Sequence, residues 1–337
     1  MRILSPVFVV LFAVWQVTYA QNLHHDFRNV IADPLLINTF YQQPNRLVGN
    51  VSSSGAVSVN ADWEQGTTPN WFIEQQRRGA DLLQAGLVLR DVKLIRQGML
   101  IESWGLKQQA ADGSFPKTGD AVHSTSLFLE ATGRAILLAR AYQHPQLQQI
   151  EQHWSPRMIK MAEWINQPEV SEPKRDVNLE PFTHRYFLRG LGLLLASRVA
   201  RNDQFDQQAI EFVRQGLQQQ QVDGTLPERN GFDLSYQSLG MNYAGRFYFW
   251  TNDKEVQTQI ANMLSQSLPI IDDHIDDAGI VRLDDSSRSN ETSRSGKAKR
   301  FDYFNAVQAY LLAERITSQK RYREIAELLA SAYQANQ

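Results

Sequence analysis

The stretch Asp223–Trp250 reads DGTLPERNGFDLSYQSLGMNYAGRFYFW. It opens with an Asp-Gly turn, and Pro227 ends any helix that precedes it. Arg229 and Tyr236 follow, seven residues apart. The run after them is rich in aromatic and small residues, which is typical of a buried helix. A loop that carries a cation and a phenol in front of a buried helix indicates the edge of an active site.

The chain from Thr68 onward is helical in pattern, because apolar residues recur at three- and four-residue spacing. Helices 92–109, 205–220 and 319–335 have polar faces, which suits an outer layer. Helices 125–143, 182–200, 234–251 and 301–317 are apolar all round, which suits an inner layer. The full set of predicted helices is 70–89, 92–109, 125–143, 156–166, 182–200, 205–220, 234–251, 254–274, 301–317 and 319–335.

A related turn recurs between outer and inner helices. It reads DGSFP from Asp112, DGTLP from Asp223 and, in a weaker form, DAGI from Asp277. A turn repeated in this way predicts an all-α fold, an α/α toroid or incomplete α/α barrel of antiparallel helix pairs over residues 68–337. An irregular helical bundle or solenoid is the alternative.

The N-terminal region has the features of an export signal. Arg2 precedes an apolar run, and Thr18-Tyr19-Ala20 supplies small residues at a cleavage site, so residues 1–20 are interpreted as a signal peptide. Residues 21–67 are predicted to be an N-terminal extension with a short helix near 31–41. No later segment is apolar enough to span a bilayer. We therefore expect a periplasmic or secreted protein without a membrane anchor.

Composition excludes several classes of protein. Lys plus Arg total 34 and Asp plus Glu total 36, for a net charge of −2, which does not suit a nucleic-acid-binding protein. The chain has no cysteine, no HExxH motif, no phosphate-binding glycine loop and no GxSxG motif. We expect no metal, no cofactor and no nucleophilic serine or cysteine, and we expect a monomer.

The segment from Asp284 to Arg300 reads DDSSRSNETSRSGKAKR and has no apolar anchor. A long loop of this kind is either a solvated surface loop or a mobile basic lid over an anionic substrate. Both interpretations are kept.

Three places combine residues that can carry chemistry. They are the loop from Asp223 to Tyr236, the start of the inner helix at His184, and the start of the inner helix at His123. Each histidine is alternatively a hydrogen-bonded packing residue. Since all three places fall at equivalent positions of the repeat, we expect them to converge on one end of the toroid.

A histidine, an arginine and a tyrosine in one place suit proton abstraction beside a carboxyl group. In β-elimination on a uronate, the proton at C5 leaves only if the neighbouring carboxylate is neutralised, which His184 or Arg229 could do by hydrogen bonding. Tyrosine has an ordinary pKa of about 10, so Tyr236 needs a cation such as Arg229 beside it to act as the base. The phenol can then return the proton to the leaving O4.

These residues resemble the alginate lyases of polysaccharide lyase family 5, which are α/α toroids. The resemblance covers Thr183–Phe249 and implies that His184, Arg229 and Tyr236 are catalytic. The family has asparagine immediately before the histidine, where this chain has Thr183. Neutralisation of the carboxylate would then need another group. Substrate-binding candidates are Thr183, Arg185, Asn178, Asn230, His123 and Tyr243, the last lying seven residues beyond Tyr236.

The resemblance implies an anionic polysaccharide as partner and substrate, namely mannuronate-rich alginate, with glucuronan or another polyuronate left open. Two alternatives remain. A glycoside hydrolase of the same fold would use two carboxylates, drawn from Asp112, Asp120, Asp223, Glu228 and Asp233, although Asp112 and Asp223 suit turn capping better. A polysaccharide-binding protein without turnover is the other.

Overall fold

The computed structural model of the chain describes residues 26–48, 51–57, 73–118, 120–171, 182–228, 231–284, 286 and 300–336. The signal peptide, most of the 284–300 loop and the end of the extension lie outside these ranges. The domain division and the lid hypothesis therefore stay predictions.

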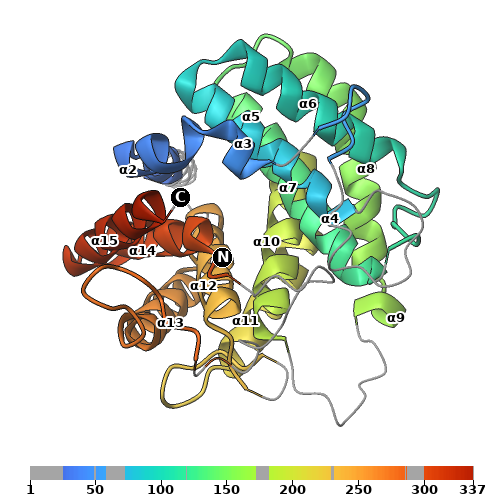
Figure 1. Cartoon of the computed structure of the whole chain (residues 1–337). Coiled ribbons are helices and arrows are strands. Elements are labelled where there is room, and N and C mark those ends of the chain that lie inside the picture. The colour runs from blue at the N-terminus through green and yellow to red at the C-terminus, as the bar shows by residue number, and fades with distance from the viewer. Residues whose placement is uncertain are drawn as a thin grey trace, which may run out of the picture.

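The apolar periodicity of the sequence produces five antiparallel helix pairs in the described ranges. The inner helices α5, α7, α10, α12 and α14 pack against one another in that order, and the outer helix of each pair covers its partner (Figure 1). Isolated β-bridges are present but no strand forms in these ranges. The pairs are α5 (Arg78–Leu89) with α6 (Val92–Lys107), α7 (Ala121–Ala141) with α8 (Leu147–Ile165), α10 (Thr183–Ala200) with α11 (Asp203–Gln218), α12 (Leu234–Trp250) with α13 (Lys254–Asp272), and α14 (Tyr303–Thr317) with α15 (Arg321–Ala335). The protein is an α/α toroid, as predicted.

Burial separates the two layers as the sequence pattern indicates. Every residue of α7 from Ser124 to Ala139 is buried, because this helix has neighbours on all sides. In contrast, α11 buries one stripe, Phe205, Ala209, Phe212, Val213 and Gly216. The short helices α4 (Ile73–Gln76) and α9 (Pro168–Ser171) lie in connections.

The repeated turn is present and has a physical reason for its glycine. Gly113, Gly224 and Gly279 have φ values of +100°, +92° and +79°, in the region that favours glycine. Gly55 at +99° belongs to a fourth copy that the sequence analysis missed. The same two backbone hydrogen bonds form in each copy. In the Gly224 turn, the Gln221 N–H donates to the Thr225 carbonyl at 2.9 Å and the Gly224 N–H donates to the Gln221 carbonyl at 2.9 Å.

Each turn glycine also lies against the outer helix of the pair that follows it. A Cβ atom would collide with a backbone carbonyl oxygen of α6 at Gly55, α8 at Gly113, α13 at Gly224 and α15 at Gly279. The turn thus fixes where the incoming chain meets the next helix pair. In the Gly279 turn the capping carboxylate is that of Asp276, which accepts the Ala278 and Ile280 N–H groups at 3.0 and 2.8 Å, and not that of Asp277.

The N-terminal residues occupy the gap between the first and last helix pairs. The π-helix η1 packs against both α5 and α15 (Figure 1). Arg323 of α15 donates two hydrogen bonds to the Asp33 carboxylate, at 2.8 and 2.6 Å, and Arg315 of α14 pairs with Asp26. The elements here are α2 (Pro34–Leu36), η1 (Ile37–Tyr41) and α3 (Pro44–Leu47), in the region where a short helix is predicted.

Two predicted helix starts are wrong. Helix α8 begins at Leu147 rather than at Pro156, which lies inside the helix on its exposed side. There water can satisfy the carbonyl that loses its backbone donor. Helix α7 begins at Ala121 because Asp120 caps it.

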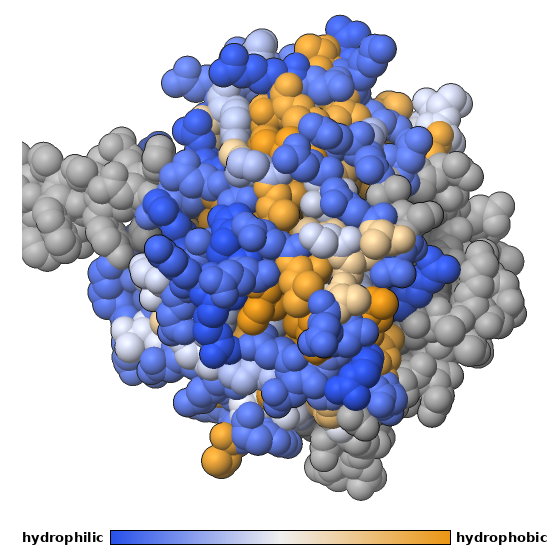
Figure 2. Space-filling view, turned by 60° about the vertical axis from the view of Figure 1, so that its left-hand side comes forward, coloured by the Kyte–Doolittle hydropathy of each residue, from blue (hydrophilic) through white to orange (hydrophobic). Residues whose placement is uncertain are grey.

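The face turned forward in Figure 2 carries hydrophilic residues around a central band of apolar ones. Among the described residues, no helix combines the length and the apolar character that a bilayer crossing requires.

Replacing Gly224 by alanine is expected to destabilise the fold by about 1–3 kcal/mol, because it forces a positive φ on alanine and drives a Cβ into the Gln266 carbonyl. Urea unfolding followed by circular dichroism measures the change. Val222→Ala in the same turn is the control, since Val222 is fully exposed and should shift stability by less than about 0.5 kcal/mol. Equal effects of the two variants would contradict the role given to the glycine.

Candidate active site

Three inner helices begin at the same end of the toroid with the same cap. The carboxylates of Asp120, Asp233 and Asp302 accept the N–H of the third helical residue of α7, α12 and α14, at 2.9, 3.0 and 3.2 Å. The third residue is His123 in α7 and Tyr236 in α12. The caps therefore place these two side chains at one mouth, as the repeat predicts.

Helix α10 has no capping side chain of its own and is capped by the Asp223 loop. The Thr183 N–H and hydroxyl both donate to the Pro227 carbonyl, at 3.2 and 2.7 Å. The His184 N–H donates to Oε1 of Glu228 at 2.9 Å. Glu228 is fully buried, so its carboxylate is available to the protein and not to solvent.

The loop that carries Glu228 is held from the other side by α12 and α13. The Leu226 N–H donates to the Gln237 side-chain oxygen at 2.9 Å, and the Gln237 amide donates to the Gly224 carbonyl at 3.2 Å. The Ser267 hydroxyl donates to the same carbonyl at 2.6 Å. These hydrogen bonds fix the turn that places Glu228 beside α10.

The His184 ring is oriented by Glu228. Its Nδ1 lies 2.8 Å from both carboxylate oxygens, and the ring is buried. A carboxylate at Nδ1 fixes the tautomer and the plane of an imidazole and leaves Nε2 to exchange a proton with another group. The pairing of a buried histidine and a buried glutamate is the arrangement of a positioned acid–base residue.

Tyr236 and His123 lie against this ring. The Tyr236 ring is stacked on His184, with centroids 4.5 Å apart and planes 5° apart. His123 meets it edge to face at 5.8 Å. We call His123, His184 and Tyr236 the imidazole–phenol cluster. It brings together two proton carriers and a phenol from α7, α10 and α12.

Arg185 adds a cation beside the cluster. Its Nη1 donates to Asp120 at 2.7 Å, and its guanidinium lies 4.3 Å from the centre of the Phe182 ring. Its Nε has no acceptor among the described residues. A guanidinium has five N–H donors, so Arg185 can hold Asp120 and also bind a substrate carboxylate.

The environment of His123 disfavours its cationic form. Burial lowers the pKa of His123 well below its ordinary value of 6.5, and the positive charge of Arg185 and its neighbours acts in the same direction. Its Nδ1 is buried without a hydrogen-bond partner in the described ranges. His123 is therefore a neutral imidazole of the cluster at neutral pH.

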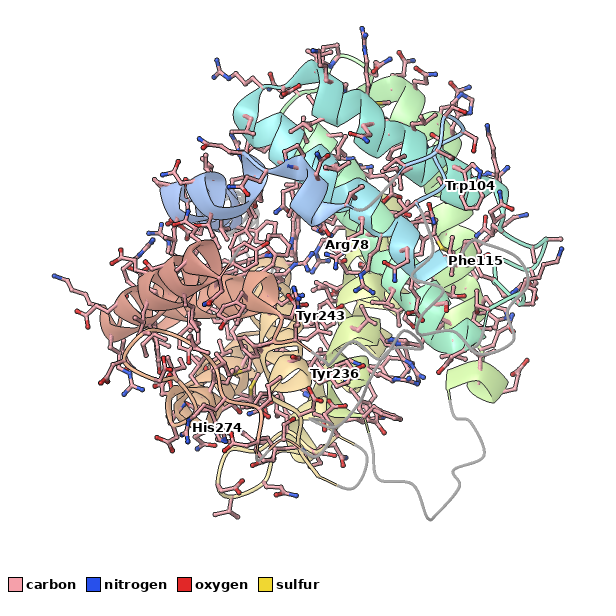
Figure 3. All side chains as sticks on the ribbon, in the orientation of Figure 1. Arg78, Trp104, Phe115, Tyr236, Tyr243 and His274 are labelled. Carbon is pink, nitrogen blue, oxygen red and sulfur yellow. The ribbon has the colours of Figure 1, made fainter. Side chains whose placement is uncertain are left out.

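The remaining predicted site residues are placed differently. Arg229, Asn178 and Asn230 lie outside the described residues, so their roles stay predictions. Thr183 is fully buried, and its hydroxyl is already bonded to Pro227. Tyr243 lies two turns along α12 from Tyr236, nearer to Arg78 (Figure 3), and burial raises its pKa to about 12.

The carboxylates named for a hydrolase all have structural partners. Asp112 and Asp223 accept the N–H groups of Ser114 and Thr225 within their turns. Asp120 and Asp233 cap helices, and Glu228 holds His184. The role of Glu228 was missed in the sequence analysis, because only the fold shows that the turn reaches α10. In the described ranges no group of three or more His, Asp or Glu side chains could hold a metal ion.

The fold is shared with solved structures of sugar-converting enzymes. A D-mannose isomerase matches with a TM-score of 0.58 and 10% identity over 90% of this chain and 86% of its own. A sugar epimerase from a ruminal bacterium matches with a TM-score of 0.55 and 11% identity, over 91% and 85%. A protein from Actinoplanes matches with a TM-score of 0.52 and 12% identity, over 87% and 80%.

At these identities the likeness establishes the α/α-toroid fold and leaves the reaction to be argued from the site. No protein-family model matches the sequence, and no curated protein matches it. The lyase reaction that the alginate lyase resemblance implies is therefore treated below as a proposal.

Replacing His123 by glutamine is expected to make stability less sensitive to acid. The folded pKa of His123 is lowered, so the unfolded chain binds a proton near pH 6.5 that the folded chain does not. The wild type should lose this part of its stability as the pH falls from 7 to 5, and His123→Gln should not. Urea unfolding at both pH values measures the difference, with His153→Gln on the exposed side of α8 as control. An identical pH dependence in wild type and His123→Gln would contradict the neutral form.

Replacing Glu228 by alanine is expected to cost about 2–5 kcal/mol of stability, since it leaves the buried His184 N–H and Nδ1 without an acceptor. Glu228→Gln keeps an oxygen for one of the two and should cost less. Urea unfolding of both variants measures the difference. If Glu228→Ala is as stable as the wild type, the cap described for α10 is wrong.

Proposed function

We propose that this protein is an exported carbohydrate-active enzyme that cleaves a polyuronate by β-elimination. The observation that carries the proposal is the imidazole–phenol cluster, in which His184 is oriented by a buried glutamate and Tyr236 is stacked on it. Arg185 stands beside this cluster with donors left for an anion. The α/α-toroid fold, which a D-mannose isomerase and a sugar epimerase share, supports a carbohydrate substrate.

The reaction assigns one role to each group. The carboxylate of the uronate is bound by Arg185 and by the Nε2 edge of His184, which stabilises the negative charge that develops when C5 loses its proton. Tyr236 takes this proton. The C4–O4 bond then breaks, a C4–C5 double bond forms, and the same phenol returns the proton to the leaving O4.

This assignment also explains how the substrate carboxylate can be neutralised although Thr183 stands where the alginate lyases have an asparagine. The alginate lyases of family 5 have an asparagine there, whereas Thr183 is bonded to Pro227 and cannot face a substrate at the same time. Arg185 is the next side chain along α10 that reaches the mouth, and a guanidinium binds a carboxylate through paired N–H groups. Alginate, polymannuronate or a related glucuronan is the proposed substrate class.

A sugar isomerase or epimerase is the second candidate. The pair of imidazoles, 5.8 Å apart with His123 held neutral, could move a proton on a carbon next to a carbonyl. The isomerase and the epimerase that share the fold make this reaction class worth testing. It would use a single sugar and form no double bond.

The test is ultraviolet absorbance of the unsaturated product with mannuronan, guluronan and glucuronan. Wild type should act on one of these polymers, and Tyr236→Phe should lower the rate about 10²- to 10⁴-fold by removing the proton carrier. Tyr248→Phe on the same helix is the matched control and should keep activity, since Tyr248 lies away from the cluster against Phe249.

Other outcomes would overturn the lyase. New reducing ends without absorbance would indicate a glycoside hydrolase, and interconversion of mannose and fructose would indicate an isomerase. Binding of a polymer with none of these products would indicate a polysaccharide-binding protein.

A further inference from the structure

A small polar pocket lies on the axis of the toroid, next to the imidazole–phenol cluster. Its accessible volume is about 20 Å³, so it can take a small polar group such as a carboxylate but not a sugar ring. It is bounded by α5, α7, α12 and α14, and Arg78 and Tyr243 face one another across it (Figure 3). Its charged lining consists of Arg77, Arg78, Arg134, Arg246, Asp81 and Glu130. The proposed reaction uses none of these residues.

The two carboxylates are already engaged with arginines. Asp81 accepts from Arg134 at 2.9 Å and from Arg78 at 3.2 Å. Oε1 of Glu130 accepts from Arg134 at 3.0 Å and also from Arg246. Three guanidinium groups thus share two carboxylates. With Arg77, the lining carries four positive and two negative side chains, an excess of positive charge.

The excess is concentrated on two residues. Arg77 forms no ion pair with any residue in the described ranges and lines the pocket directly. Arg246 is buried and shares its one carboxylate partner with Arg134. Buried positive charge is costly unless an anion neutralises it, which applies to Arg246, whereas Arg77 is partly buried. A guanidinium has five N–H donors, so both residues keep donors for an anionic ligand.

The pocket extends from the level of the cluster, where Asn305 is the third residue of α14, to a deeper level of the toroid. On α7, Glu130 is seven residues beyond His123, and on α12, Tyr243 is seven residues beyond Tyr236. Seven residues of α-helix correspond to about 10 Å. A bound saccharide could therefore reach both places only if it is longer than one sugar ring.

The pocket is closed on its deep side. Arg134 donates to the Gln84 side-chain oxygen at 3.1 Å, and the Gln84 amide donates to the Tyr41 hydroxyl at 2.7 Å. All three side chains are buried. A saccharide that enters from the mouth would therefore end at this pocket. A closed pocket of this kind suits the carboxylate of the terminal sugar of a polymer and not that of a sugar within it.

We infer that this pocket binds the carboxylate of a terminal uronate, through Arg77 and Arg246, while the bond to be broken lies at the imidazole–phenol cluster. This inference rests on the proposed function and deepens it, because it makes the enzyme act from one end of the polymer. It assigns substrate binding to residues of α12 and of the segment before α5 that the sequence analysis did not select.

Binding is tested separately from catalysis. Sodium glucuronate should raise the Tm of the wild-type protein, since a ligand that binds only the folded state stabilises it. Glucose, which lacks the carboxylate, should not do so at the same ionic strength. Tyr236→Phe should keep the shift, because Tyr236 does not line the pocket.

Arg77→Gln and Arg246→Gln should each weaken glucuronate binding about 10- to 100-fold, as expected for the loss of a charge-assisted hydrogen bond. Arg214→Gln on the surface of α11 is the matched control and should bind like the wild type. Circular dichroism shows whether each variant is folded. Should Arg246→Gln fail to fold, Arg77→Gln carries the test, since Arg77 makes no ion pair that the fold depends on.

An equal effect of glucuronate and glucose, or an unchanged affinity in folded Arg77→Gln, would overturn the subsite. Glucuronate binding that depends on Arg77 would support the subsite. If the same protein cleaves no polymer, the subsite would stand and the proposed lyase reaction would be wrong. With a polymer that is cleaved, the wild type should release one short unsaturated product from the start. A ladder of product lengths would overturn action from the chain end.

Discussion

The contact between a turn glycine and a carbonyl oxygen of the following outer helix is the constraint on which this toroid depends. It occurs at Gly55, Gly113, Gly224 and Gly279. The Gly55 turn joins the N-terminal segment to the first helix pair, and the other three each join one helix pair to the next. Packing at this distance leaves no room for any side chain. At these four turns backbone packs directly on backbone, so the approach of the turn to the helix does not depend on the size of a side chain.

The candidate site follows from the same contact. The Gly224 turn, held by Gln237 and Ser267, leads directly to Glu228, and Glu228 caps α10 and orients the ring of His184. One carboxylate thus has a structural and a chemical role. A change in the turn would alter helix packing and ring orientation together, so stability and activity are coupled at this point of the fold.

Much of this was predictable from sequence, for identifiable reasons. The inner helices are apolar all round because they are enclosed, and the Asp-Gly turns are visible because only glycine fits them. The Gly55 turn was missed because Ser52, not an aspartate, accepts the Ala56 N–H. The first half of α8 was missed because Pro156 resembles a helix start.

The sequence also contains a signal for the buried charged residues inside the ring. Glu130, Arg134 and Arg246 interrupt helices that are otherwise apolar, and a charge in an enclosed helix must find a partner of opposite sign. That reasoning predicts an ionic cluster inside the ring. It does not predict which helices meet there, since Asp81 comes from α5 and Arg246 from α12. The excess of arginine over carboxylate side chains becomes apparent only when the fold shows which residues lie together.

The closure of the ring has a consequence for how the protein folds. Asp33 and Arg323 are separated by 290 residues, and their paired hydrogen bonds join the first described elements to the last helix. Contacts so distant in sequence form slowly, because a long loop must close before they are made. During synthesis the early segment cannot meet its partner until α15 exists. The helix pairs can assemble one after another, whereas the complete ring is a late event that requires the entire chain.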